Sequence, residues 1–316
     1  MENCDQFGSL RAQPLHVAKP FLKWAGGKSQ LLGKFESLYP DELKNKKVET
    51  YVEAFVGSGA VFFEIIRNYN AKQIVIIDSN KDLIICYKII KKNVPELILT
   101  LSNLQNEYWK QSDDTRVDYY NNKRKKFNKL RSELDYTKMN KDWIDCAALM
   151  IFLNKTCFNG LYRVNSSGGF NVPIGSQKKP TICDEKNLNA VSKVLQNIEI
   201  IEGDYTLCEN YASENTFIYF DPPYRPLNKS SSFNSYSSTG FNDNEQERLA
   251  EFFEKMNKTK TKLMLSNSDP KNTDSTDNFF DELYSKHEIV RVPAVRAINS
   301  KGDERGKITE IVVRNY

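Results

Sequence analysis

Short apolar runs alternate with amphipathic stretches along most of the chain, and this alternation predicts strands followed by helices. Residues 51–56 and 73–77 predict the first two strands, and helices are expected at 29–38, 60–69 and 82–92. The alternation resumes near residue 198. Further strands are expected at 198–201, 217–220, 262–265, 289–292 and 308–313, with a helix at 244–256. Strands that alternate with helices favour a parallel, doubly wound α/β sheet of the Rossmann-like type.

The segment 93–190 has a different character, because it is rich in Lys, Asn and Tyr. Its pattern predicts helices to about residue 154. A stretch rich in Gly, Ser and Asn follows and carries a β-hairpin-like segment at 161–174. We therefore expect a flexible leader at 1–18, an α/β core formed by 19–92 and 191–316, and an inserted, mainly helical domain at 93–190.

Composition is that of an ordinary soluble globular protein, with 40% hydrophobic and 27% charged residues among 316. No apolar run approaches the ~20 residues that a membrane span needs, and residues 1–19 lack the apolar centre of an export signal. The six cysteines form no CxxC pair, and only two histidines are present. We expect no metal site and no disulfides, but free thiols in a reducing cytoplasm.

The most informative motif is Asp221-Pro222-Pro223-Tyr224, directly after the apolar run 217–220. Ligands bind at the carboxyl ends of strands in open α/β sheets. Asp221 and the Pro222 carbonyl could accept the two protons of an exocyclic amino group, and Tyr224 could stack on a base. A proline-rich turn after a strand is the alternative. The motif thus favours an enzyme that methylates a nucleobase amino group, with S-adenosyl-L-methionine as cofactor.

A second motif is Phe55-Val56-Gly57-Ser58-Gly59, with Asp78 21 residues after Gly57. Glycines after a first strand let the backbone approach a ligand, and an acidic residue about 20 positions on can bind ribose hydroxyls. A plain tight turn is an equally good interpretation of these glycines.

A third motif, residues 21–29, ends in Gly26-Gly27-Lys28-Ser29 but lacks the earlier glycine and the preceding strand of a phosphate-binding loop. ATP hydrolysis is therefore excluded. Trp24 and Lys28 suit an aromatic ring and a cation that close over a cofactor with a purine and a carboxylate. The alternative is a tryptophan packed on a helix start.

Taken together and in this order, the motifs resemble the Dam-type DNA adenine-N6 methyltransferases (D12 class, alpha group), which include methylases of restriction–modification systems. The resemblance runs from about residue 20 to 316. It also includes 159–165, 170–173, 203–205, 265–268, 305–307 and Glu310 through Tyr316.

The resemblance implies site-specific methylation of adenine N6 in double-stranded DNA, with GATC as the expected target and a flipped base as the substrate. It implies catalytic roles for Asp221, Pro222, Pro223 and Tyr224, and cofactor binding by Trp24, Lys28, Phe55, Gly57, Gly59, Asp78, Asp204 and Asp221. Residues 93–190 would recognise the target. The DNA-binding residues would be Asn159, Leu161, Arg163, Asn165, Pro173, Lys178 and Lys179.

The resemblance also implies a cytoplasmic protein of a prokaryote or phage, monomeric or weakly dimeric, that could act beside a cognate restriction endonuclease. Cytosine-N4 methylation, RNA adenine methylation and a cofactor-free DNA-binding regulator are the alternatives. The net charge of +4 permits DNA binding without requiring it. The basic run 123–131 suits either DNA phosphates or a solvated helix face.

Overall fold

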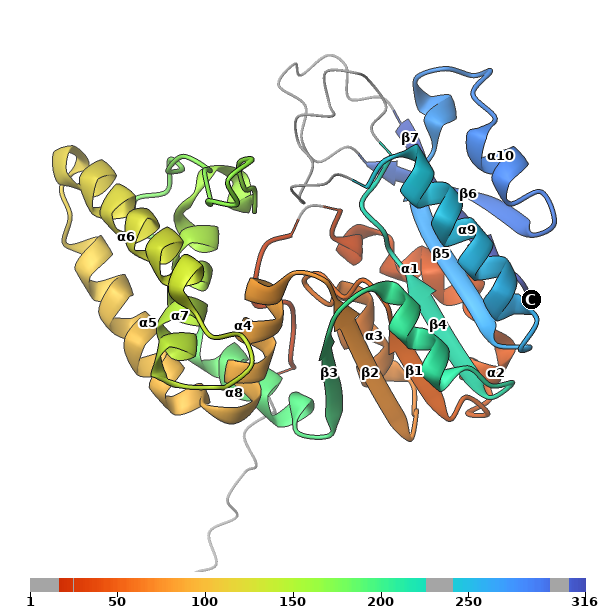
Figure 1. The fold of residues 1–316 in the computed structure, drawn as a ribbon, viewed down its shortest axis with the longest axis horizontal. Coiled ribbons are helices and arrows are strands. Elements are labelled where there is room, and N and C mark those ends of the chain that lie inside the picture. The colour runs from red at the N-terminus through yellow and green to blue at the C-terminus, as the bar shows by residue number, and fades with distance from the viewer. Residues whose placement is uncertain (1–16, 25, 226–240, 296–306) are drawn as a thin grey trace, which may run out of the picture.

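A mixed β-sheet forms the centre of the molecule (Figure 1). The computed structural model describes residues 17–24, 26–225, 241–295 and 307–316. The strand order is β3-β2-β1-β4-β5-β7-β6, and β7 runs antiparallel to both of its neighbours, whereas the other neighbouring pairs are parallel. The strands are β1 (Thr50–Glu53), β2 (Gln73–Asp78), β3 (Ile198–Glu202), β4 (Thr216–Phe220), β5 (Lys262–Ser268), β6 (Glu288–Val295) and β7 (Lys307–Arg314).

Strand β4 shows why the sheet is buried on both faces. All five of its residues are buried. Phe217 and Tyr219 enter the hydrophobic cluster on one face, and Ile218 and Phe220 enter the cluster on the other. Since successive strand side chains point to opposite faces, a continuous apolar run such as this one marks a strand with helices on both sides.

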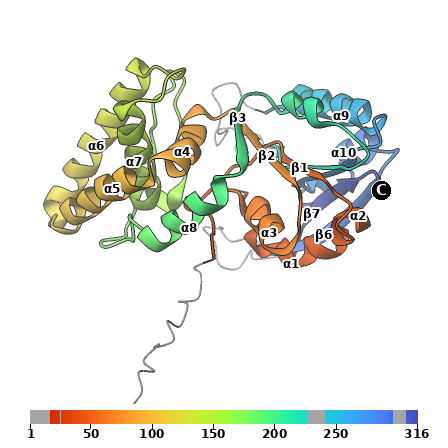
Figure 2. The same cartoon turned by 90° about the horizontal axis from the view of Figure 1, so that it is seen from below.

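Helices cover the two faces of the sheet (Figure 2). One face carries α1 (Leu32–Phe35), α2 (Asp41–Lys44) and α3 (Ala60–Asn68), and the other carries α9 (Asp243–Asn257) and α10 (Phe279–Leu283). Short 3-10 helices lie at Lys28–Gln30, Glu36–Leu38, Phe158–Gly160, Tyr205–Tyr211 and Pro270–Asn272. The expected α/β fold is confirmed.

The helical segment lies at the β3 end of the sheet (Figure 1). It contains α5 (Val94–Trp109), α6 (Asp113–Glu133), α7 (Lys141–Thr156) and α8 (Glu185–Leu195), next to α4 (Lys81–Lys92) of the core. Helix α7 is its centre, because almost every residue from Cys146 to Thr156 is buried. The segment and α4 share one hydrophobic cluster. The boundaries at 93 and 190 stay a prediction; residue 190 itself falls inside α8.

Three expectations differ in detail from the structure. The helix expected at 29–38 is α1 flanked by two 3-10 turns. The hairpin at 161–174 has two isolated antiparallel bridges, Val164 with Phe170 and Cys157 with Ile174, because its Ser- and Gly-rich tip provides few strand-forming residues. Of the expected leader, residues 1–16 lie outside the described part of the chain, and Ala18 is buried.

Candidate functional site

A cavity of about 710 Å³ opens at the carboxyl ends of β1 and β4. These two strands are neighbours in the sheet, but the chain leaves β1 toward β2 and β3 and returns to β4 only after the helical segment. Such a change of direction is the topological switch point, where open α/β sheets bind ligands. The volume is typical of a site for a small molecule.

The turn after β1 forms one wall. Gly57 has φ of +49°, a left-handed conformation that glycine adopts without strain. Its N–H donates to Asp78 Oδ2 over 3.0 Å, and Asn80 N–H donates to Asp78 Oδ1 over 2.9 Å. Burial raises the pKa of Asp78. Gly59, at φ of +76°, does not line the cavity; a Cβ there would lie 2.7 Å from the Tyr87 hydroxyl, so this glycine permits close packing.

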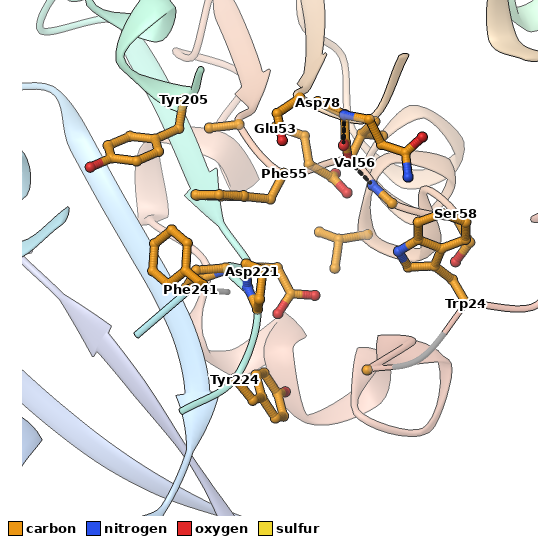
Figure 3. Close-up of a pocket in the computed structure, with 18 of the residues that line it drawn as sticks. Trp24, Glu53, Phe55, Val56, Ser58, Asp78, Tyr205, Asp221, Tyr224 and Phe241 are labelled. Atoms are coloured by element: carbon orange, nitrogen blue, oxygen red, sulfur yellow. Dashed lines mark hydrogen bonds between the residues drawn. The ribbon is translucent and has the colours of Figure 1, made fainter. Parts of the chain in front are cut away.

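Trp24 closes the same wall from the N-terminal segment (Figure 3). A Cβ on Gly57 would lie 2.9 Å from Trp24 Cδ1, so the indole rests directly on the turn. Trp24 also stacks on Tyr162, with ring centroids 5.5 Å apart and planes 25° apart.

The end of β4 places Asp221 in the cavity. Lys28 Nζ lies 2.5 Å from Asp221 Oδ1, and the Ser266 hydroxyl donates to the same oxygen over 3.1 Å. Burial raises the pKa of Asp221, and the charge of Lys28 opposes this rise. The Lys28 ammonium also donates to the Gly26 carbonyl over 2.8 Å. Lys28 therefore fixes Asp221, whereas the expected contact with a cofactor carboxylate stays a prediction.

The rest of the Asp221–Tyr224 motif is equally constrained. Tyr224 donates its hydroxyl to Glu310 of β7, and Lys28 Nζ lies 4.5 Å from the centre of the Tyr224 ring. Gln246 Nε2 donates to the Pro223 carbonyl over 3.0 Å. Within the described residues, no hydrogen bond uses the Pro222 carbonyl, so an acceptor stands free beside Asp221 in the lining of the cavity.

Glu53 is a second carboxylate in the cavity lining, and no role for it was expected from the sequence. It ends β1, is 2% exposed, and accepts the Tyr51 hydroxyl over 2.6 Å. Burial raises its pKa well above the ordinary value. The sequence does contain a signal for Glu53: it is an acidic residue within the apolar run that leads into the glycine turn. Asp221 is likewise an acidic residue next to an apolar run.

Aromatic side chains form the wall opposite Trp24 (Figure 3). Phe55 stacks on Tyr205 with centroids 5.2 Å apart, and Phe241 packs edge-on against Phe55. Asp204 lies beside them, caps the 3-10 helix that starts at Tyr205, and pairs with Arg248 over 2.9 Å. Tyr205 belongs to the 203–205 part of the resemblance, but no role for its side chain is expected there. Phe241 has no motif signal, because only packing between separate parts of the chain brings it here.

The structure places the expected DNA-binding residues outside the cavity lining, in the segment that follows α7. Asn159, Asn165, Pro173, Lys178 and Lys179 are exposed, and Leu161 and Arg163 are half-buried. Arg163 Nε donates to Asn171 Oδ1 over 2.7 Å. Lys178 pairs with Asp113 over 2.6 Å at the surface. Their roles toward DNA stay predictions.

The basic run 123–131 is not simply a solvated face. Arg124 donates to the Val172 carbonyl over 3.2 Å, and Arg131 donates to the Gly168 carbonyl over 2.5 Å. Arg131 also lies 2.6 Å from Asp82, whose side chain is 1% exposed. These two arginines therefore hold the hairpin-like segment on α6.

Neither a metal centre nor a membrane span is found in the described ranges. No group of three or more His, Cys, Asp or Glu side chains there could hold a metal ion. None of the helices in the same ranges has the length and apolar character needed to cross a bilayer.

The sheet order, with β7 between β5 and β6, and the carboxylate at the end of β4 define a Rossmann-like α/β methyltransferase. Residues 24–298 match the model of the D12 class N6 adenine-specific DNA methyltransferases, and the chain belongs to this family. It is an enzyme that methylates N6 of adenine in DNA. The family membership expected from the motif order is confirmed.

Three relatives illustrate this membership. The chain is 48% identical to the Type II methyltransferase M.MjaIII of Methanocaldococcus jannaschii, over 94% of this chain and 99% of that one. It is 38% identical to the Type II methyltransferase M1.LlaDCHI of Lactococcus lactis subsp. cremoris, over 94% and 95%. It is 31% identical to the DNA adenine methylase of Haemophilus influenzae, over 96% and 95%.

Proposed function

We propose that the enzyme takes its methyl group from S-adenosyl-L-methionine and transfers it to a flipped adenine in double-stranded DNA, within GATC. The observation that carries this proposal is Asp221 at the switch point, next to the anchored ring of Tyr224 and to the Pro222 carbonyl, to which no described residue donates. Relatives named DNA adenine methylase and Type II methyltransferase support it.

The cavity lining fits the proposed cofactor. A purine would find aromatic surface at Phe55, Tyr205 and Phe241, and ribose hydroxyls would find the Asp78 carboxylate. The missing Cβ of Gly57 lets the Trp24 indole pack directly on the turn that would face the cofactor. The residues that would hold the cofactor are Trp24, Phe55, Gly57, Asp78, Asp204 and Asp221. When bound, the sulfonium group supplies an electrophilic methyl group.

The chain's own residues would prepare the adenine. The Asp221 carboxylate and the Pro222 carbonyl accept the two N6 protons, which favours a nitrogen whose lone pair is free for attack. Lys28 holds Asp221 through one oxygen, and no described side chain donates to Oδ2, so Oδ2 can face the substrate. Positioning and electrostatics then lower most of the barrier. Stacking on Tyr224, worth ~1–3 kcal/mol, offsets part of the cost of flipping.

The surface after α7 would contact DNA. We assign base contacts to Asn159, Leu161, Arg163, Asn165 and Pro173, and phosphate contacts to Lys178 and Lys179. The Type II names of two relatives support action beside a cognate restriction endonuclease.

A plasmid methylation assay tests the proposal. The full chain is incubated with plasmid and labelled S-adenosylmethionine, and the modified base is mapped by digestion and sequencing. Label on adenine N6 within GATC is expected. Label on cytosine N4, label on RNA in a parallel assay, or adenine methylation at another sequence would overturn the corresponding part.

Asp221→Ala is the matched variant for this assay. Transfer should be abolished, because N6 loses its acceptor, and an unchanged circular dichroism spectrum shows that the variant is folded; S-adenosylhomocysteine should still bind, though more weakly, because Asp221 is one of several proposed cofactor residues. Activity within about tenfold of the wild type, which corresponds to a change of ~1.4 kcal/mol in barrier height, would refute the proposed role of Asp221.

A further inference from the structure

Tyr162 lies between two residues that we propose read DNA, Leu161 and Arg163, yet its side chain points away from the surface and is 4% exposed. Its ring stacks on Trp24, the indole that forms a wall of the cofactor cavity. One side chain thus joins the DNA-facing segment to the cavity.

Tyr162 is held firmly in this place. Its hydroxyl donates to Asp82 Oδ2 over 2.5 Å. Asp82 lies in the first turn of α4, a helix capped by Asn80 of the cavity lining. Arg131 Nε lies 2.6 Å from the same Asp82 oxygen, and its guanidinium donates to the Gly168 carbonyl in the hairpin-like segment. The ring therefore cannot leave Trp24 without disturbing this buried ion pair.

A second contact fixes the backbone next to Trp24. The buried amide of Asn154 accepts the Lys23 N–H over 2.9 Å and donates to the Lys23 and Gly160 carbonyls, both over 2.8 Å. Gly160 packs so closely on Lys23 that a Cβ there would lie 2.5 Å from Lys23 Cδ. The base of the DNA-facing segment and the N-terminal segment that carries Trp24 thus form one packed unit.

We infer that Tyr162 is a positioning residue that holds Trp24 over the cofactor cavity and couples cofactor binding to DNA binding. This inference rests on the proposed function. DNA that orders the segment around Tyr162 also orders Trp24, so each ligand strengthens the binding of the other by the same factor. Couplings of this kind are typically about 5- to 150-fold, and we expect about tenfold here.

Calorimetric titration of the full chain with S-adenosylhomocysteine tests the inference. Titrations are made without DNA and with a saturating short duplex that carries the sequence methylated in the plasmid assay. Wild type should bind S-adenosylhomocysteine about tenfold more tightly with the duplex. Tyr162→Leu should weaken binding without DNA by about two- to tenfold, as loss of one aromatic pair implies, and should abolish the enhancement by DNA.

Two variants separate positioning from general stability. Tyr162→Phe keeps the ring on Trp24 and should restore both quantities to near wild type. Tyr119→Leu is the matched control, because the Tyr119 hydroxyl also donates to a carboxylate, Glu107, but the ring packs on Phe152. It should leave both quantities unchanged.

The outcomes separate cleanly. A wild type that binds no S-adenosylhomocysteine would overturn the proposed cofactor, and with it this inference. A wild type that binds it equally well with and without DNA, or a folded Tyr162→Leu protein that keeps the full enhancement, would overturn the inference alone. If Tyr162→Leu does not fold, Trp24→Leu replaces it. If DNA no longer increases the affinity of Trp24→Leu for S-adenosylhomocysteine, the coupling is supported. If DNA increases that affinity as much as in the wild type, the inference is overturned.

Discussion

Substituting Gly57 by alanine tests the wall that Trp24 forms. The left-handed backbone at Gly57 costs a non-glycine residue roughly 1–2 kcal/mol. The new Cβ would also lie 2.9 Å from Trp24 Cδ1, closer than carbon atoms pack, so the indole must move. Moving it loses a stacked pair with Tyr162, worth about 0.5–1.5 kcal/mol. We expect S-adenosylhomocysteine affinity to fall about tenfold, ~1.4 kcal/mol.

Gly168→Ala is the matched control for this substitution. Gly168 has φ of +78°, but a Cβ added there would meet nothing within 4 Å. Both variants should lose unfolding free energy in urea from backbone strain, and Gly57→Ala should lose more because its Cβ displaces Trp24. Only Gly57→Ala should lose cofactor affinity in calorimetry without DNA. Equal affinities in the two variants would refute Trp24 as the cofactor wall.

Three further predictions concern pH, salt and burial. Because burial raises the Glu53 pKa well above 4.5, the folded protein keeps a proton that the unfolded chain releases, so stability falls as pH rises from 4.5 toward the folded pKa. Glutamine does not titrate, so the unfolding free energy of Glu53→Gln in urea, minus that of the wild type, should increase as pH rises. A difference that does not change with pH would contradict the raised pKa of Glu53. Replacing Lys178 and Lys179 by glutamine should weaken binding to all duplexes alike and lower the salt slope by about 2, and a loss at one base pair alone would contradict phosphate contact. Arg131→Leu leaves Asp82, 1% exposed, without its cation, so it should lower the unfolding free energy by about 3–5 kcal/mol; a loss under about 1 kcal/mol would refute the importance of this pair.

The parts of the site that the sequence predicts are those that lie at the ends of apolar runs. Asp78 ends the buried strand β2, Asp221 follows β4, and Gly57 comes shortly after β1. Their place at the carboxyl edge of the sheet therefore comes from local pattern alone. Their order along the chain then indicates the family. The strands and helices of the α/β core follow from the same apolar runs, and their predicted bounds differ from the observed ones by a few residues.

The parts that the sequence does not predict depend on contacts between distant segments. Tyr162 meets Asp82 across 80 positions, and Tyr224 meets Glu310 across 86. Neither pair has a local signature, because the residues around one partner do not indicate the other, and a carboxylate alone suggests a surface position. Arg131 shows the same limit: it belongs to a charge run that suits a solvated face, and only the packed structure reveals its buried partner.

The position of β7 has a consequence for the co-translational folding of the enzyme. This strand is made after β6, yet it lies between β5 and β6 and provides the partner of the Tyr224 hydroxyl. While β7 is still untranslated, β6 has no strand to join, and Tyr224 lacks its anchor. A nascent chain or a prematurely terminated product should thus leave DNA unmodified, so that methylation begins only once translation has passed residue 314.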